Sequence, residues 1–388
     1  MRVPLAWSNL MHQKARTAIA VAGVAFAVVL IFMQLGFYGS VEATATLVYD
    51  QLEFDIILVS SEYLHIQEPG SFPQVRLAQA SAVPGVARVA PVYIGFNRWR
   101  NPDDPADHPY GRKRRHLLVL GIRPTDRTFR LAEVQAQRWR LREPNVVLMD
   151  RRSRFEFFGE GLQTGDQTEV GVTRISIGGW FSLGGGFGGD GTIIVGDDTF
   201  SRLFGNRSLD RVTLGLVQTH DHDPDQVRQV ACQLGEVLPD DVAILTRDQL
   251  RRWETHHWVH NTSVGIIFGL GLVIALSVGI IFVYQVVSSD ISSHLPEYAT
   301  LKAIGYDQPY LVGVILRQSL LLALLGYLPG LAAALGLYAL TRRSANLPIE
   351  MNLGRMVLVF VLAVAMCGVS GVLSVQKLRV ADPADLFR

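Results

Sequence analysis

The stretch "VGIIFGLGLVIALSVGIIFVYQVVS" (264–288) contains no charged residue and is long enough to cross a membrane as a helix, because a bilayer core needs roughly 20 consecutive apolar residues. The chain of 388 residues is 49% apolar, yet 18% of its residues are charged. This mixture is typical of a membrane protein with a large water-facing part. The formal net charge of +1 gives no reason to expect a nucleic-acid partner.

Three further apolar runs are long enough to span, at 17–40, 311–340 and 356–376. The run at 17–40 outlasts the roughly 7 to 15 apolar residues of a signal peptide, and no small-residue cleavage site follows it. We therefore expect it to remain as an anchor. Together with 264–288, these runs predict an α-helical membrane protein with four transmembrane helices.

Lysine and arginine near the ends of the spans predict the orientation, because cytoplasmic loops carry an excess of both residues. The basic residues on the side that we expect to be cytoplasmic are Arg2, Lys14, Arg16, Lys302, Arg317, Lys377, Arg379 and Arg388. Arg342, Arg343 and Arg355 oppose this bias. We predict that segment 1–16, loop 289–310 and tail 377–388 are cytoplasmic, and that segment 41–263 and the short loop 341–355 are extracytoplasmic.

Segment 41–263 alternates between strand-like and helix-like patterns and predicts one large α+β domain with helical stalk ends. "FDIILVS" (54–60), "FPQVRLAQASAVPG" (72–85) and "VARVAPVYIGF" (86–96) predict a first βαβ unit. The residues from 211 to 246 predict a second, with its helix starting near Pro224. Short β-like runs between the two units suggest an inserted β-rich subdomain.

The glycine-rich stretch "GGWFSLGGGFGGDG" (178–191) lacks the Lys-Ser or Lys-Thr that a phosphate-binding loop needs at a helix start. We interpret it as a turning loop between strands. If it has a function, its aromatic residues Trp180, Phe181 and Phe187 would contact a partner or lipid. The basic run "GRKRRH" (111–116) fits a solvated loop better than a site for an acidic partner.

His256 and His260 have the i, i+4 spacing of metal ligands, and His257 lies between them. "HHWVH" lacks the HExxH arrangement of a zinc hydrolase. We favour the interpretation that Trp253 and Trp258 are interfacial anchors and that these histidines are polar residues on the same helix. The sequence also lacks a nucleophile-elbow signature. We therefore assign no catalytic, cofactor-binding or metal-binding residues.

The energy source is expected to lie in another chain. The four apolar runs contain no Asp, Glu or His that could relay ions through the membrane. The sequence also contains no P-loop motif. An ATP-driven machine would therefore need a separate ATPase, which binds ATP and magnesium and docks on a cytoplasmic feature of this chain.

The segment "SHLPEYATLKAIGYDQPYL" (293–311) is a candidate for that feature. Pro296 fits a first helical position, Glu297 and Lys302 match the helix dipole, and Gly305 can end the helix. The side chains that could face a partner are those of Tyr298, Leu301 and Ala303. An ordinary amphipathic connector at the membrane surface fits the same pattern.

A resemblance favours docking over a connector. "PEYATLKAIGY" (296–306) resembles the Glu-x-x-x-x-Lys-Ala-x-Gly signature of the FtsX-like and MacB-like permeases of type VII ABC transporters. "LAWSNLMHQKARTAIAVAGVAF" (5–26) resembles their amino-terminal segment, and "LRVADPADLFR" (378–388) their tail. "AGVAFAVVLIFMQLGF" (22–37) with "EYATLKAIGY" (297–306) is similar to the DevC-type permeases of glycolipid-exporting systems.

The resemblance implies a role and partners. It implies a homodimeric permease in the bacterial inner membrane, with a porter- and sabre-like periplasmic domain and no enzyme activity in this chain. Its coupling helix would comprise Pro296, Glu297, Tyr298, Leu301, Lys302, Ala303 and Gly305. The implied partners are a DevA-like or MacB-like ABC ATPase, a DevB-like or MacA-like periplasmic adaptor and a TolC-like outer-membrane channel. By mechanotransmission the complex would export a lipophilic substrate, such as a glycolipid, from the periplasmic side.

One departure from the family pattern bears on the function. Ala299 stands where the family often has glycine, which fits the DevC-like branch and makes lipoprotein extraction a poorer match. The alternative is an FtsX-like signalling permease that activates a periplasmic cell-wall hydrolase. A standalone membrane enzyme would need neither an ATPase nor an adaptor, and the missing catalytic constellation counts against it.

Overall fold

The computed structural model describes residues 14–102, 114–153, 161–184, 190–293, 308–345 and 348–380. The chain divides into two compact units. The helical unit comprises 1–39, 265–344 and 349–388, and the outer domain comprises 40–264 with 345–348.

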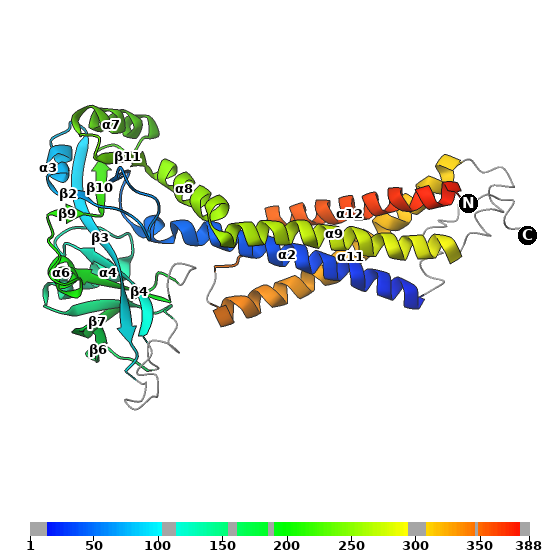
Figure 1. The fold of residues 1–388 in the computed structure, drawn as a ribbon, viewed down its shortest axis with the longest axis horizontal. Helices are drawn as coiled ribbons and strands as arrows, with labels where there is room; N and C mark the ends of the chain where they lie inside the picture. Colours follow the sequence, from blue (N-terminus) through cyan, green and yellow to red (C-terminus); the bar gives the residue numbers. More distant parts are fainter. Residues whose placement is uncertain are drawn as a thin grey trace, which may run out of the picture. The chain divides into compact units, whose positions relative to one another are not determined.

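Four long helices form the helical unit (Figure 1). They are α2 (Lys14–Gln51), α9 (Ser263–Ser293), α11 (Gln308–Ala345) and α12 (Leu353–Val380). Each is long and apolar enough to cross a membrane, which confirms the four spans of the predicted fold class. The helices extend past the apolar runs into segments that the sequence predicts to be loops, at 289–293, 308–310 and 353–355. Hydropathy marks where a helix meets hydrocarbon, whereas its backbone hydrogen bonds can continue beyond.

Glycines allow α2 and α11 to approach closely. A Cβ atom on Gly326 would lie 2.5 Å from Val24 Cβ, and one on Gly36 would lie 2.4 Å from the Tyr338 hydroxyl. That hydroxyl donates a hydrogen bond to the Phe32 carbonyl. Small residues at such contacts are how membrane helices gain packing energy, since apolar burial alone gives little advantage in lipid.

The outer domain is built on one nine-stranded sheet, in the order β11-β1-β10-β3-β4-β8-β5-β7-β6. The strands are β1 (Ile56–Ser60), β3 (Val86–Arg100), β4 (Arg114–Ile122), β5 (Val146–Asp150), β6 (Gln167–Val170), β7 (Thr173–Phe181), β8 (Gly191–Gly196), β10 (Leu214–Thr219) and β11 (Val242–Thr246). A small separate sheet pairs β2 (Phe72–Pro73) with β9 (Arg211–Val212). The mixed α/β domain confirms the water-facing part of the fold class.

The two predicted βαβ units interlock. The first is β1, α3 (Val75–Ser81) and β3, and the second is β10, α7 (Pro224–Val237) and β11. Strand β10 lies between β1 and β3, and β1 lies between β10 and β11, with antiparallel pairing throughout. Each unit therefore has its two parallel strands separated by a strand of the other unit, which is a split βαβ arrangement.

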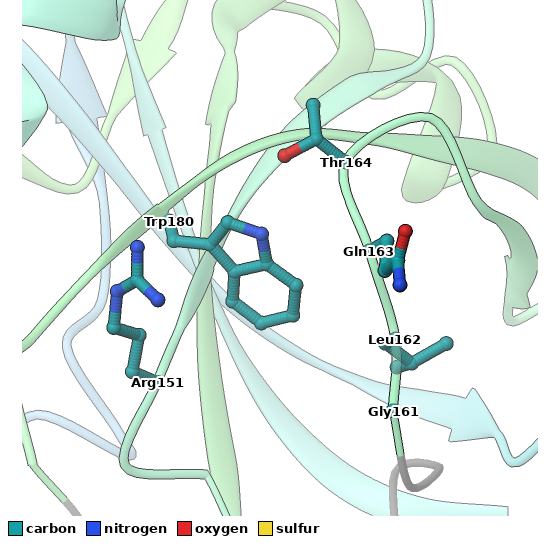
Figure 2. A pocket seen from close by; sticks show the side chains of 6 residues that line it. All are labelled: Arg151, Gly161, Leu162, Gln163, Thr164 and Trp180. Carbon is teal, nitrogen blue, oxygen red and sulfur yellow. The ribbon is translucent and has the colours of Figure 1, made fainter.

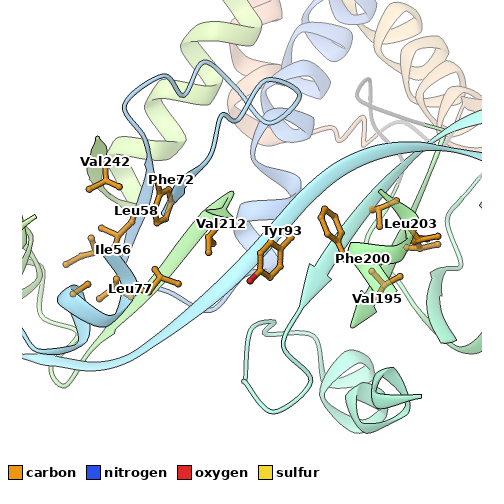
Figure 3. Close-up of a cluster of buried hydrophobic side chains, with 14 of the residues drawn as sticks. Ile56, Leu58, Phe72, Leu77, Tyr93, Val195, Phe200, Leu203, Val212 and Val242 are labelled. Atoms are coloured by element: carbon orange, nitrogen blue, oxygen red, sulfur yellow. The ribbon is translucent and has the colours of Figure 1, made fainter. Parts of the chain in front are cut away.

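The predicted β-rich insert lies between the two units in the sequence, and its strands extend the same sheet. Strand β3 is 15 residues long. It pairs with β10 over its first half and with β4 over its second half, meeting both strands at Val92. A single buried apolar cluster accordingly runs from Ile56 on β1 to Val195 on β8 (Figure 3).

Replacing Gly326 with leucine should loosen the contact between α2 and α11, because the new side chain would overlap Val24. Overpacking costs about 1–3 kcal/mol. We expect the apparent thermal midpoint of the detergent-solubilised chain to fall on the order of 5 °C. Gly336→Leu on the same helix is the control, since a Cβ atom on Gly336 would have no other atom within 4 Å among the described residues. Equal shifts for both variants would contradict the close α2–α11 packing.

Candidate functional site

The carboxyl end of α2 meets one arginine of the outer domain. Arg247 is the first residue of α8 (Arg247–His256). Its guanidinium donates hydrogen bonds to the carbonyls of Tyr49 at 3.2 Å, Leu52 at 2.7 Å and Phe54 at 2.9 Å. Tyr49 lies in the last turn of α2, where carbonyls lack a full set of partners within the helix, and Leu52 and Phe54 lie in the segment that follows it.

The same guanidinium lies 4.1 Å from the centroid of the Phe54 ring, a cation–π distance. Burial lowers the pKa of Arg247 to about 10, which leaves it charged at neutral pH. The backbone N–H of Arg247 also donates to the Asp55 carbonyl at 3.1 Å. Arg247 therefore holds the chain segment that joins α2 to β1.

A capping box fixes the start of α8. The Thr246 hydroxyl accepts from the Gln249 backbone N–H at 3.4 Å, and the Gln249 side chain accepts from the Thr246 N–H at 2.8 Å. Thr246 is also the last residue of β11, which pairs with β1. The sheet edge, the start of α8 and the end of α2 thus form one connected structure.

A buried polar cluster joins α2 and α8 a second time. The Tyr49 hydroxyl donates to Glu254 Oε1 at 3.2 Å, the Tyr63 hydroxyl donates to the same oxygen, and the two hydroxyls bond to each other. All three residues are buried. We call Tyr49, Tyr63, Arg247 and Glu254 the stalk junction.

The triangle of three oxygens in this junction favours a protonated carboxyl. Filling three hydrogen bonds needs three hydrogens, and the two phenols supply only two. Burial raises the pKa of Glu254 to about 7, although the hydrogen bonds from Tyr63 and Tyr49 lower it. A proton on Glu254 would supply the third hydrogen: the carboxyl then donates to one phenol, that phenol donates to the other, and the other donates to the carboxyl.

The chain beyond α8 changes helical type and then breaks. Residues His257–Asn261 form a single π-helical turn, η2, and Thr262 has extended backbone (φ −104°, ψ 151°). Such π turns are often found at functional sites. The two connections of the outer domain therefore differ: α2 is one continuous helix of 38 residues, whereas the return path is interrupted before α9.

The three histidines do not converge. His256 and His260 stack on each other at 4.6 Å between ring centroids, whereas His257 stacks on His65 at 4.3 Å. Within the part of the chain that the structure describes, no group of three or more His, Cys, Asp or Glu side chains is placed to hold a metal ion.

The two tryptophans beside these histidines differ in exposure. Trp258 is buried and contacts the rings of His65 and His257, so the expectation that it is an interfacial anchor is wrong. Trp253 is 50% exposed, and its indole N–H donates to the Leu64 carbonyl at 3.0 Å.

The glycine-rich stretch 178–191 is only partly a loop. Its first four residues complete β7, and Gly191 opens β8. Phe181 is fully buried, so the expected partner contact is wrong for that residue. Phe187 lies outside the described residues. In the basic run 111–116, Arg114 and the two residues after it begin β4 and are not a loop, and the residues before them are not described.

The predicted coupling residues also lie outside the described residues. They are Pro296, Glu297, Tyr298, Leu301, Lys302, Ala303 and Gly305. Helix α9 ends at Ser293 before them, and α11 begins at Gln308 after them.

The stalk junction was missed from the sequence, although two signals point to it. The pattern Thr246-x-x-Gln249 is a capping box and marks the start of α8. Leu250 and Glu254 are spaced i, i+4 on the buried face of that helix, where a carboxylate needs partners. The identity of those partners could not be inferred, because Tyr49 is 205 residues away in the chain.

Comparisons with known families and structures add to this geometry. The family model of the MacB-like periplasmic core domain matches residues 17–232, more than half of the chain, and that of the FtsX-like permease C-terminal matches residues 269–383. No curated protein matches the sequence.

Two similar solved structures are both of outer domains. The extracellular domain of the noncanonic ABC-type transporter YknZ from Gram-positive bacteria is 14% identical, with a TM-score of 0.34 over 50% of this chain and 99% of that one. The periplasmic region of MacB from Actinobacillus actinomycetemcomitans is 10% identical, with a TM-score of 0.35 over 53% of this chain and 94% of that one.

Replacing Arg247 with alanine should destabilise the outer domain by about 3 kcal/mol, because buried carbonyls lose their donor. Arg247→Lys should recover only part of this, since an ammonium cannot reproduce the planar fork. Arg251→Ala is the control, because Arg251 has an exposed ion pair with Asp50 at 3.6 Å. Denaturant unfolding of the full chain, followed by tryptophan fluorescence, measures the difference. Equal effects of Arg247→Ala and Arg251→Ala would disprove the role of Arg247.

Glu254→Gln should remove a pH dependence of stability. The pKa of Glu254 is about 7 in the folded protein against an ordinary value of 4.5, so the folded state binds more protons between these values. The parent's stabilisation by this group is complete below about pH 4.5 and is lost as the pH rises through 7, by about 3 kcal/mol in total.

The measurement is the difference in unfolding midpoint between parent and Glu254→Gln at pH 5 and pH 8. His65, whose pKa burial lowers, titrates in both proteins, so its contribution cancels in that difference. We expect the parent to lose stability relative to the variant as the pH rises. A difference that stays constant from pH 5 to pH 8 would mean that Glu254 does not titrate in this range.

Proposed function

This chain belongs to the MacB-like and FtsX-like permeases of type VII ABC transporters, and we propose that it is the permease subunit of a tripartite exporter driven by mechanotransmission. The match of residues 17–232 to the MacB-like periplasmic core domain carries this proposal. With four apolar helices and this family, the chain is a membrane protein with a periplasmic domain. We place it in the inner membrane of a bacterium.

The family implies a partner ABC ATPase, which is a separate subunit. In our proposal that ATPase binds ATP and magnesium, and this chain carries no catalytic residues and no cofactor. The segment between α9 and α11 would dock on it through the coupling residues Pro296, Glu297, Tyr298, Leu301, Lys302, Ala303 and Gly305. Glu297 would lie at the positive end of the helix dipole in this segment. Reversing its charge would therefore destabilise the helix and weaken its contact with the ATPase.

The stalk junction gives mechanotransmission a physical path. Helix α2 would be about 57 Å long at 1.5 Å per residue and has no break. Because Arg247 and the Glu254 cluster hold its carboxyl end, a displacement along α2 must also move β1, β11 and α8. The extended Thr262 then gives the other connection a point at which it can bend.

The finer assignments follow from the motifs. Similarity to DevC-type permeases favours a lipophilic substrate, such as a glycolipid, taken from the periplasmic side. Such a system would use a homodimer of this chain, a DevB-like or MacA-like adaptor and a TolC-like outer-membrane channel. The FtsX-like match at 269–383 suits an exporter and a signalling permease alike, whereas the MacB-like core at 17–232 favours the exporter over activation of a cell-wall hydrolase.

Two variants test the two ends of this path. The chain is purified from its own membrane with its stoichiometric partners, which mass spectrometry identifies, and ATP hydrolysis is then measured. Glu297→Lys should remove the ATPase from the complex and abolish the stimulated hydrolysis. Arg247→Ala should retain the ATPase in the purified complex, because this residue lies in the outer domain and outside the docking segment. Its effect on coupling requires a second measurement, the export of substrate per ATP hydrolysed, which should fall.

Glu236→Lys is the control, since this residue is exposed on α7. It should leave both assembly and hydrolysis unchanged. Assembly and hydrolysis like the parent in Glu297→Lys would refute the coupling assignment. Co-purification of a wall hydrolase without an adaptor would replace the exporter with the signalling permease.

A further inference from the structure

A cavity of about 510 Å³ opens beside Trp180 in the outer domain. It is lined by Arg151, Gly161, Leu162, Gln163, Thr164 and Trp180 (Figure 2). Its volume falls within the range of roughly 300–1,000 Å³ that is usual for small-molecule sites. In Figure 2 the indole of Trp180 projects between the Arg151 guanidinium and the segment 161–164.

The cavity lies where two parallel strands end. Strands β5 and β7 are parallel, with Met149 opposite Trp180 and Asp150 opposite Phe181. Arg151 directly follows β5, and Trp180 is one residue from the end of β7. In α/β sheets, ligands bind outside the carboxyl ends of parallel strands, which is the position of this cavity.

Trp180 is fixed by a side-chain amide. The Gln137 amide donates to the Trp180 carbonyl at 2.8 Å and accepts from the Trp180 N–H at 3.3 Å. The two residues before the tryptophan are glycines, and a Cβ on Gly179 would lie 1.9 Å from Gln137 Oε1. Gly179 therefore lets Gln137 reach the strand and bond to the backbone of Trp180.

Arg151 is fixed by its backbone. Its N–H donates to the Phe181 carbonyl at 2.8 Å. The buried carboxylate of Asp150 accepts from the N–H groups of Arg152, Leu183 and Gly184, each at 3.0 Å. These bonds hold the turns after β5 and β7 together, and the Arg151 guanidinium lies 5.7 Å from the indole centroid. The backbone that carries Arg151 and Trp180 is therefore held in place on this side of the cavity.

The lining has the chemistry of a sugar site. The indole offers a flat apolar surface for the C–H face of a ring. Arg151 supplies only donors, while the Gln163 amide and the Thr164 hydroxyl each donate and accept. A ligand that fits has one apolar face and hydroxyl groups around its rim, as a pyranose ring does. An acyl chain would leave the polar groups unpaired.

We propose that this cavity binds a single pyranose ring, stacked on Trp180 and hydrogen-bonded through Arg151, Gln163 and Thr164. Two sources could present that ring, a lipid-linked sugar or the glycan of the cell wall. If the source is lipid-linked, the site binds the head group of the exported substrate, and this reading rests on the proposed export function. Sugar binding itself requires neither the ATPase nor transport.

The test uses the full chain in lipid nanodiscs, free of sugar-based detergent, and no ATPase. Saturation-transfer NMR follows methyl β-glucoside and triacetylchitotriose as the two probes. We expect transfer to at least one probe and a loss of affinity of about tenfold in Trp180→Ala. Trp180→Phe should retain most of the binding, because it keeps an aromatic surface, and Arg151→Gln should weaken it. Trp139→Ala, which removes a tryptophan that is 56% exposed elsewhere, should have no effect.

Lipid analysis of the purified chain distinguishes the two sources of the sugar. A sugar lipid that is enriched with the parent but not with Trp180→Ala supports the lipid-linked source, and preference for triacetylchitotriose without such a lipid supports the wall glycan. No transfer to either probe, or transfer that survives both Trp180→Ala and Arg151→Gln, would overturn the proposal. So would a partner protein that binds through Trp180 while neither sugar binds. None of these results affects the outcome of the ATPase test with Glu297→Lys. The sugar-binding proposal and the exporter proposal can therefore each fail independently of the other.

Discussion

The constraint on which this structure depends is that the last carbonyls of a helix need donors from outside that helix. Within hydrocarbon a helix satisfies its own backbone, but α2 ends inside a folded domain, where an unpaired buried carbonyl is costly. The Arg130 N–H meets this need at the Gln51 carbonyl, and the Arg247 guanidinium reaches the Tyr49 carbonyl in the last turn and the carbonyls of Leu52 and Phe54 just beyond the helix. Arg247 is also the first residue of α8 and directly follows β11. The end of α2 is therefore bonded to the point where β11 and α8 meet.

The continuous sheet determines how far a displacement at that point can reach. Strand β1 begins five residues after α2 ends, and it pairs with both β10 and β11. Strand β3 then links this part of the sheet to β4, and β8 and β5 continue it to β7. The cavity at Trp180 and the stalk junction therefore lie on the same continuous sheet. Since close-packed protein interiors transmit strain, a displacement at one site can reach the other. A separate inserted subdomain would have allowed the two sites to move independently.

The sequence predicts those features that depend on neighbouring residues. Uniform apolarity over 264–288 indicates a span, and Asp223 followed by Pro224 marks the start of α7, where the aspartate does cap the helix. Interlocked βαβ units leave no such trace, since periodicity reports which face of a strand is buried and not which strand lies beside it. The glycines before Trp180 resemble part of a loop for the same reason, because Gly178 makes room for Val146 and Gly179 for Gln137, and both residues are distant in sequence.

The two connections of the outer domain differ in their backbone regularity. A continuous helix such as α2 resists bending, whereas a π turn followed by extended Thr262 has lost the regular hydrogen-bond ladder and bends at low cost. Glu254 lies on α8 just before that turn and is bonded to Tyr49 on α2, so it joins the stiff connection to the flexible one. The pKa of its carboxyl is about 7, because the hydrogen bonds from the two phenols favour the charged form while burial disfavours it more strongly. The residues that hold the carboxyl end of α2 therefore also hold α8, the helix from which the return path to α9 begins.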